Sequence, residues 1–145
     1  MEVSNVYNAH ASTVFDFLIK LFIEDFKQNT SKDIEPEQIV PGLKYTKVFK
    51  THHQVQVEVL EVSAPHIYKV QITSSRGRQV IHYDLKEISE GQLQIVYREL
   101  NEPSGFFGTW NYKILRFFLK KRLERRMLLQ IDKLVEFSTT DTSIQ

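Results

Sequence analysis

The sequence predicts a single α+β domain in which an antiparallel sheet is flanked by one helix near each end of the chain. Two observations lead to this class. The spacing of apolar residues changes from three and four to two and back again, which indicates helix, then strands, then helix. The links between the predicted strands are short and rich in turn-forming residues, as in hairpins. At 145 residues, the chain has the length of one domain that needs no disulfide or metal to fold.

Composition excludes several classes of protein. There is no cysteine, so a disulfide framework, thiolate catalysis and cysteine-ligated metal sites are all excluded. The polar start lacks the apolar run of a signal peptide. The richest apolar stretch, residues 14–26, is interrupted by four charged residues, and a membrane span needs about 20 predominantly apolar ones. We therefore expect a cytoplasmic protein that requires no cofactor.

The first expected elements are a strand and a helix. Residues 2–9 alternate loosely between apolar and polar side chains, which favours a strand. A helix follows, for which Ser12 or Thr13 is the expected N-cap, and its apolar residues recur at spacings of three and four. Residues 28–42 are polar, so we expect at most one helical turn there, over residues 36–40.

Five further strands are expected, because apolar residues then alternate with polar ones. They are predicted over residues 43–50, 54–62, 67–74, 79–88 and 92–100. Within the second of them the alternation shifts phase, which indicates a β-bulge. Consecutive strands on short links form an antiparallel meander with one apolar and one polar face.

A second helix is expected to begin near Phe106. We place the end of the single domain at residue 137 and expect residues 138–145 to form a flexible polar tail. The apolar residues in the two halves of this helix lie on different faces. The halves must therefore face different partners, or the helix must bend near residues 119–121.

This order of elements resembles the helix-grip fold of the START-like superfamily, which includes Bet v 1-like and polyketide-cyclase-like proteins. Residues 9–18 are similar to the strand-to-helix entry of that superfamily, and Gly105-Phe106-Phe107 resembles the entry into its last helix. A closer resemblance is to the bacterial family called domain of unknown function 3284. Its similar segments are residues 45–47, 73–76, 96–99 and 118–123. The resemblance implies a sheet wrapped around the last helix with an apolar cavity between them, and it implies no particular chemistry.

Aromatic residues are the main candidates for a ligand-binding site. The predicted inner face of the sheet and the start of the last helix carry Tyr45, Phe49, Tyr68, Tyr83, Tyr97, Trp110 and Phe118. These rings can line a pocket for a small hydrophobic or amphipathic molecule. They can equally fill the core and leave no cavity. Of the possible functions, we prefer non-catalytic binding to an enzyme.

Glu99 is the one weak catalytic candidate. It follows Tyr97 by two residues and should share its face, where Lys47 is a possible partner. One hypothesis is a polar anchor for a ligand, or an acid or base in a cyclase-like enzyme. The other, which we favour here, is that Glu99 lies beyond the end of the core and is solvated. Ser74 and Ser75 have no histidine nearby, so we expect no nucleophilic catalysis.

The five histidines do not form a metal-binding pattern. His52, His53 and His66 fall in predicted turns, and His82 falls on the polar face of its strand; His10 precedes the first helix. Surface histidines are the ordinary outcome for such positions. We expect no metal site.

The last helix carries a basic run of seven Lys and Arg within residues 113–126, preceded by several aromatic residues. Such a run is usually the solvated face of a packed helix, and we favour that interpretation. The alternative is weak contact with anionic membranes. The residues for that contact would be Phe106, Phe107, Lys120, Lys121, Arg122, Arg125 and Arg126. We do not favour a nucleic acid as partner.

Overall fold

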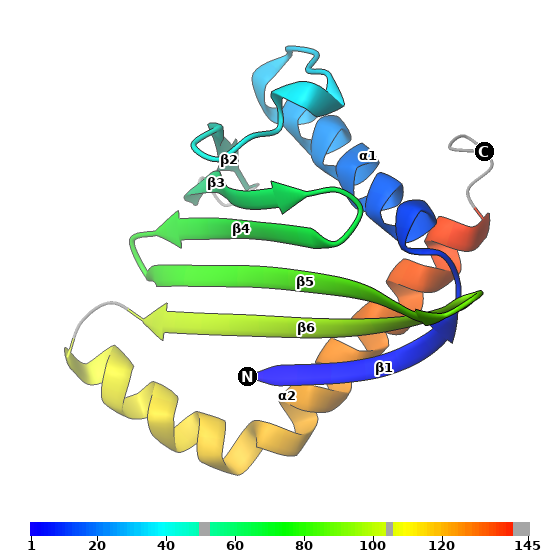
Figure 1. The fold of residues 1–145 in the computed structure, drawn as a ribbon. Helices are drawn as coiled ribbons and strands as arrows, with labels where there is room; N and C mark the ends of the chain where they lie inside the picture. The colour runs from blue at the N-terminus through cyan, green and yellow to red at the C-terminus, as the bar shows by residue number, and fades with distance from the viewer. Residues whose placement is uncertain (50–52, 104–105, 141–145) are drawn as a thin grey trace.

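The fold, seen in a computed structural model, is one six-stranded antiparallel sheet with two helices packed on one face (Figure 1). The structure describes residues 1–49, 53–103 and 106–140, with only the backbone of residues 106–116 and 118. The elements are β1 (Glu2–Asn8), α1 (Ala11–Thr30), a short 3₁₀ turn η1 (Pro36–Gln38), β2 (Lys44–Val48), β3 (Gln54–Ser63), β4 (Ile67–Ser74), β5 (Gly77–Ser89), β6 (Gln92–Pro103) and α2 (Phe106–Thr140).

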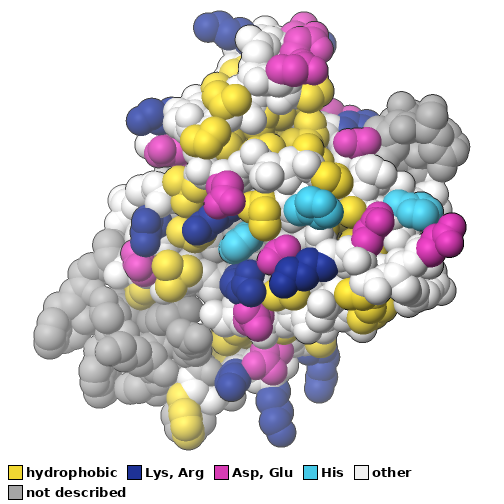
Figure 2. Space-filling view, viewed as in Figure 1, with side chains coloured by type: hydrophobic (Ala, Val, Ile, Leu, Met, Phe, Trp, Pro, Cys, Tyr) yellow, Lys and Arg dark blue, Asp and Glu magenta, His cyan; other side chains and the backbone are white. Residues whose placement is uncertain are grey.

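The predicted meander is confirmed. Strands β2 to β6 pair consecutively and antiparallel, and β1 pairs with β6 at the other edge, so the strand order is β1-β6-β5-β4-β3-β2. The predicted bulge in the second meander strand is also present, because the register of β3 against β4 shifts between Val59 and Glu61. Figure 2 shows the face of the sheet away from the helices, where acidic, basic and histidine side chains are interspersed.

Helix α1 begins at Ala11, before both of the predicted caps. His10 occupies the N-cap position with extended backbone and contributes no side-chain hydrogen bond. Instead, the Ala11 amide donates to the Glu87 carboxylate of β5 over 3.0 Å. A helix N-terminus needs acceptors for its free amides. In this protein the acceptor is Glu87, which is distant from the helix in the sequence, so a local capping pattern could not predict it.

The core lies between the sheet and the two helices. From α1 it takes an apolar stripe that includes Phe15 and Phe22, and from α2 it takes Met127 and Ile131. In Figure 1, α2 changes direction where its colour passes from yellow to orange, and the later segment is the one that crosses behind the sheet. This arrangement agrees with the change of apolar face between the halves of the helix.

The end of α2 differs from the expected tail. The helix continues to Thr140, and Ser138 is fully buried with its hydroxyl donating to the Val135 carbonyl over 2.8 Å. Ser and Thr side chains near a helix end can donate back to carbonyls three or four residues earlier, so a polar sequence does not end a helix by itself. Residues 141–145 of the predicted tail lie outside the described residues. None of the described helices combines the length and hydrophobicity needed to cross a membrane.

Candidate functional site

A cavity of about 280 Å³ lies between α1 and the inner face of strands β2 to β5. Its walls are mainly apolar, with Leu18 and Phe22 from α1 on one side and Val57 and Val70 of the sheet on the other. Five of the predicted site residues line it: Tyr45, Lys47, Phe49, Tyr68 and Tyr83. The sequence predicts a cavity between the sheet and the last helix. Among the side chains that the structure describes, the lining of this one comes from α1 and the sheet instead.

Asp25, Tyr45 and Lys47 form a polar cluster on one side of the cavity. Lys47 Nζ donates to Asp25 Oδ1 over 2.8 Å, and the Tyr45 hydroxyl donates to Asp25 Oδ2. The predicted pairing of Lys47 with Glu99 is therefore wrong. Lys47 lies on β2 at one edge of the sheet, whereas Glu99 lies on β6 near the other edge, and the strand order separates them. A helical carboxylate that sequence analysis did not single out is the partner.

The aromatic surroundings hold this cluster in place. The Tyr45 ring meets Phe22 and Phe26 edge-on, at centroid distances of 5.6 and 5.3 Å. Burial, and then the hydrogen bond to Asp25, raise the pKa of Tyr45 well above its usual value, so its hydroxyl stays a donor. Phe49 is 44% exposed and stacks with His53, while Lys47 Nζ lies 5.6 Å from its ring centroid. Phe49 is thus an exposed residue of the lining and is not part of the buried core.

Three tyrosines form a row across the inner face of the sheet. Tyr68, Tyr83 and Tyr97 are directly paired on β4, β5 and β6. Their ring centroids lie 6.1 Å apart for the first two and 4.7 Å apart for the second two. Burial raises the pKa of Tyr83 to about 12 and shifts the pKa values of the other two further in the same direction. All three phenols therefore remain protonated at neutral pH.

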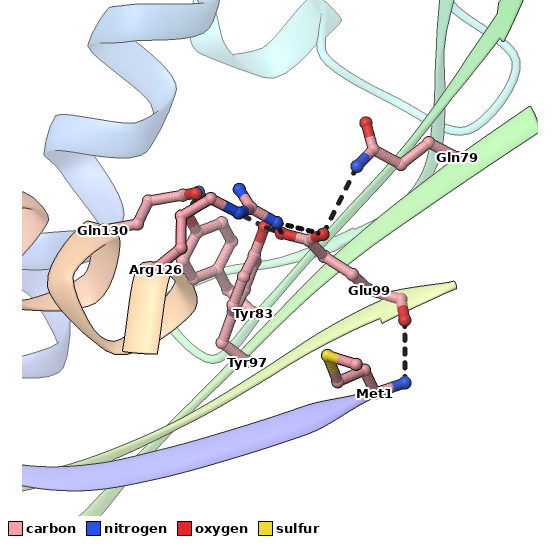
Figure 3. Close-up of polar contacts among 7 residues, drawn as sticks. All are labelled: Met1, Gln79, Tyr83, Tyr97, Glu99, Arg126 and Gln130. Atoms are coloured by element: carbon pink, nitrogen blue, oxygen red, sulfur yellow. Dashed lines mark hydrogen bonds and ion pairs between the residues drawn. The ribbon is translucent and has the colours of Figure 1, made fainter. Parts of the chain in front are cut away.

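Glu99 is buried at the end of this row (Figure 3). Its carboxylate accepts hydrogen bonds from Arg126 at 2.9 and 3.2 Å, from Tyr97 at 2.6 Å and from Gln79 at 3.4 Å. The side chain is only 3% exposed, so our expectation of a solvated Glu99 is wrong. Its cationic partner comes from α2, and the sequence does not tell how that helix is placed on the sheet.

The geometry around Glu99 suits a structural anion better than a proton acceptor. A carboxylate offers about four acceptor positions. In this protein, Arg126 and Gln79 use Oε1 while Tyr97 and Arg126 use Oε2. Both carboxylate oxygens therefore already accept hydrogen bonds from protein donors. The carboxylate instead orients Tyr97.

Gln130 of α2 extends this network to the cavity. Its amide nitrogen donates to the Tyr83 hydroxyl over 3.1 Å and to the Tyr97 hydroxyl over 3.2 Å (Figure 3). Because Tyr83 also lines the cavity, the chain from Glu99 through Tyr97 and Gln130 fixes one hydroxyl of the cavity wall. Asp25, Arg126 and Gln130 are not among the residues that the sequence singles out. Each of the three directly precedes a buried apolar residue of its helix. A polar residue at the border of an apolar helix face is therefore the sequence feature that could have identified them.

The remaining candidates are dispersed. Trp110, Phe118, Phe106 and Phe107 have side chains outside the described residues, and so does His52. His66 shares a hydrogen bond of 2.9 Å with the Leu85 carbonyl through Nδ1, and His10 lies 3.9 Å from Glu87. Within the described part of the chain, no group of three or more potential ligands could hold a metal ion.

The basic run on α2 is only partly available to an external partner. Lys120, Lys121, Arg122 and Arg125 are exposed. Arg126, which the sequence places in the membrane-facing set, has its guanidinium on the buried Glu99. Lys120 lies 4.0 Å from Glu124, one helical turn away. The membrane contact remains a prediction.

Comparison with known proteins gives a family match and several structures of similar fold. A family model described as a domain of unknown function, DUF3284, matches residues 1–120. No curated protein matches in sequence. Similar solved structures include DynU16, described as a putative protein in the dynemicin biosynthetic locus (TM-score 0.59, 10% identity, 97% of this chain and 47% of that one). The chain thus spans about half the length of DynU16.

Two other solved structures match over nearly their whole length. Ara h 8.0201 has a TM-score of 0.59 at 9% identity, covering 97% of both chains. The MLL2253 protein from Mesorhizobium loti has a TM-score of 0.56 at 14% identity, covering 97% of this chain and 99% of that one. At such identities the likeness shows the fold alone.

Proposed function

The chain belongs to the DUF3284 family and has the Bet v 1-like helix-grip fold, and we propose that it binds a small apolar or amphipathic molecule without chemically changing it. The observation that carries this proposal is the cavity between α1 and the sheet. Its valine, leucine and phenylalanine walls would bury an apolar surface, and a few hydroxyl and charged groups would orient the molecule.

The polar groups near the cavity favour binding over catalysis. A catalytic acid or base must have a free position from which to exchange a proton with the substrate. Glu99 has its acceptor positions occupied by Arg126, Tyr97 and Gln79. Asp25 is likewise engaged by Lys47 and Tyr45. Both carboxylates therefore support the cavity wall.

The proposal places the ligand against α1 and strands β2 to β5. The candidate contacts are Tyr45, Lys47, Phe49, Tyr68 and Tyr83, with apolar surface from α1. Tyr97 and Glu99 act behind them as supporting residues. Trp110 and Phe118 stay in the proposal as sequence-based candidates.

A cavity-filling variant tests this function. Ile81 lines the cavity, so Ile81→Phe should reduce its volume. Ile88→Phe is the matched control, because Ile88 is 55% exposed and lies near the end of β5. The neutral two-ring fluorescent probe 6-propionyl-2-dimethylaminonaphthalene should bind the wild type and the control, be displaced by tetralin, and bind Ile81→Phe at least several-fold more weakly.

Native mass spectrometry of freshly purified protein adds an independent measurement. A co-purified small hydrophobic molecule should be present on the wild type and depleted on Ile81→Phe. If the probe binds neither form, or binds both equally and without displacement, the protein has no such ligand site.

A further inference from the structure

Building on the proposed function, we propose that the ligand is a neutral carbonyl compound of one or two rings, whose carbonyl oxygen accepts hydrogen bonds from the hydroxyls of Tyr68 and Tyr83. The inference rests on the way the polar atoms of the cavity are used. Most of them are paired within the protein, and these two phenols are the exceptions.

The Tyr68 hydroxyl has no hydrogen-bond partner among the residues that the structure describes. The side chain is 8% exposed and contributes to the cavity lining. The phenol is deeply buried, and burial is the main reason why its pKa is raised. The hydroxyl oxygen is not fully buried, so it is open to the cavity, where a ligand oxygen can replace water as its acceptor.

The Tyr83 hydroxyl is paired on one side only. It accepts the hydrogen bond from Gln130 at 3.1 Å, which leaves its own proton free to be donated. No acceptor for that proton lies within reach in the described part of the chain. Tyr97 provides the contrast, because it also accepts from Gln130 but donates its proton to Glu99 over 2.6 Å. Tyr83 therefore lacks only an acceptor.

The two free donors belong to neighbouring residues of the same cavity wall. Tyr68 and Tyr83 are directly paired across β4 and β5, with their ring centroids 6.1 Å apart, and both line the cavity. An sp² oxygen has two lone pairs and can accept both hydrogen bonds at once.

Charge around the pair favours a neutral acceptor over an anion. Asp25 lines the same cavity as the two phenols, and Glu99 accepts from Tyr97, whose ring centroid lies 4.7 Å from that of Tyr83. The cationic residue of the cavity lining, Lys47, already pairs with Asp25, and Arg126 pairs with Glu99. An anionic ligand would face these carboxylates without a free cation among the residues that line the cavity, whereas a ketone, ester or amide carries no such penalty.

Size restricts the ligand further. A cavity of about 280 Å³ is at the lower end of the range of about 300–1,000 Å³ for small-molecule sites. One or two rings fill this volume, and a longer molecule would extend past the exposed lining residues Leu21 and Phe49 into solvent. The expected ligand is therefore a compact apolar body with one polar oxygen.

A series of two-ring compounds that differ in one group tests the inference. The series is 1-tetralone (carbonyl), tetralin (no oxygen), 1-tetralol (hydroxyl) and tetralin-1-carboxylate (anion), titrated by displacement of the fluorescent probe and by calorimetry. For wild type, 1-tetralone should bind about 3-fold to 10-fold more tightly than tetralin, as expected for one or two net hydrogen bonds. It should also bind more tightly than the alcohol and the anion.

Variants assign that preference to the two phenols. Tyr68→Phe and Tyr83→Phe should each reduce the preference for 1-tetralone over tetralin, and the double variant should abolish it while still binding tetralin. The control is Tyr7→Phe, because Tyr7 donates to Asp132 and does not line the cavity. The carbonyl stretching frequency of bound 1-tetralone should shift down in wild type and the control, and should return toward the value in an apolar solvent in the double variant.

Each contrary outcome has a distinct meaning. Equal affinity of wild type for 1-tetralone and tetralin, or a preference that survives in the double variant, overturns the inference and leaves the proposed function intact. Tightest binding of the carboxylate also overturns it. If none of the four compounds binds and no probe binds either, the proposed function itself fails.

Discussion

Arg126 of α2 donates two hydrogen bonds to the buried carboxylate of Glu99 in β6, at 2.9 and 3.2 Å. The pair connects the last helix to the sheet directly next to the tyrosine row. Because Tyr97 donates to the same carboxylate and Gln130 donates to both Tyr97 and Tyr83, the position of a hydroxyl in the cavity wall depends on an ion pair outside the cavity.

Removing Arg126 should destabilise the fold and disturb the cavity. Arg126→Met leaves the Glu99 carboxylate buried and without its cation, and we expect the free energy of unfolding to fall by about 1–3 kcal/mol. Arg125→Met is the matched control, because Arg125 is the exposed neighbour on the same helix and should change stability by less than about 0.5 kcal/mol. Urea denaturation followed by circular dichroism measures both.

A double substitution separates the charge from the packing. If the penalty comes from the uncompensated carboxylate, Arg126→Met combined with Glu99→Gln should be more stable than Arg126→Met alone. Equal stability of the two variants would mean that Arg126 contributes through its aliphatic stem instead.

The strands are predictable from the sequence because each one has a clear apolar and a clear polar side. The predicted strand over residues 54–62 corresponds to β3 at Gln54–Ser63, and its phase shift corresponds to the bulge between Val59 and Glu61. An alternation of apolar and polar residues predicts both that a segment is a strand and which of its side chains face the core. For that reason the alternation of side chains alone assigns Tyr68 and Tyr83 correctly to the same face of the sheet.

The polar partners are not predictable in the same way. Assigning Arg126 to Glu99 requires the position of α2 along the sheet, and assigning Lys47 to Asp25 requires the rotation of α1 above β2. Both depend on how side chains from distant segments pack together, which a local period does not encode. A basic helix face has the same sequence pattern whether or not one of its arginines reaches a buried carboxylate, so the pattern does not separate Arg126, whose side chain is 52% exposed, from its neighbours.

The start of α1 gives a second prediction, since Glu87 supplies its capping acceptor. Glu87→Ala should destabilise the protein by about 0.5–2 kcal/mol, the range typical of losing an N-cap, while Glu87→Gln should retain much of that stability because its amide oxygen can still accept from Ala11. Glu90→Ala, in the exposed turn after β5, is the control. Denaturant titration should give the order wild type, Glu87→Gln, Glu87→Ala. If the two Glu87 variants are equally stable, the negative charge at the helix N-terminus matters and the hydrogen bond does not.

The outer face of the sheet gives a third prediction, which concerns pH. His82 lies between Lys69 of β4 and Arg98 of β6 in the strand register, and its Nε2 is buried without a hydrogen-bond partner in the described structure. Burial, followed by the charges of Arg98 and Lys69, lowers the pKa of His82, and Asp84 and Glu61 oppose this shift only in part. The folded protein therefore resists protonation of His82 more strongly than the unfolded chain does.

The sign of the effect follows from this difference in proton binding. Above the ordinary histidine pKa of about 6.5, neither state binds the proton and His82 does not affect the pH dependence. As the pH falls below that value, the unfolded chain binds the proton first, so the free energy of unfolding decreases until the lower pKa of the folded state is passed.

His82→Gln should remove this loss of stability, so the free energy of unfolding of the variant should fall less than that of wild type between pH 7.5 and pH 5. Gln56→Asn serves as the control, because Gln56 is an exposed residue of β3 and its replacement leaves every titratable group in place. Urea midpoints of the three proteins at several pH values make the comparison, and parallel curves for wild type and His82→Gln would show that His82 does not couple folding to protonation.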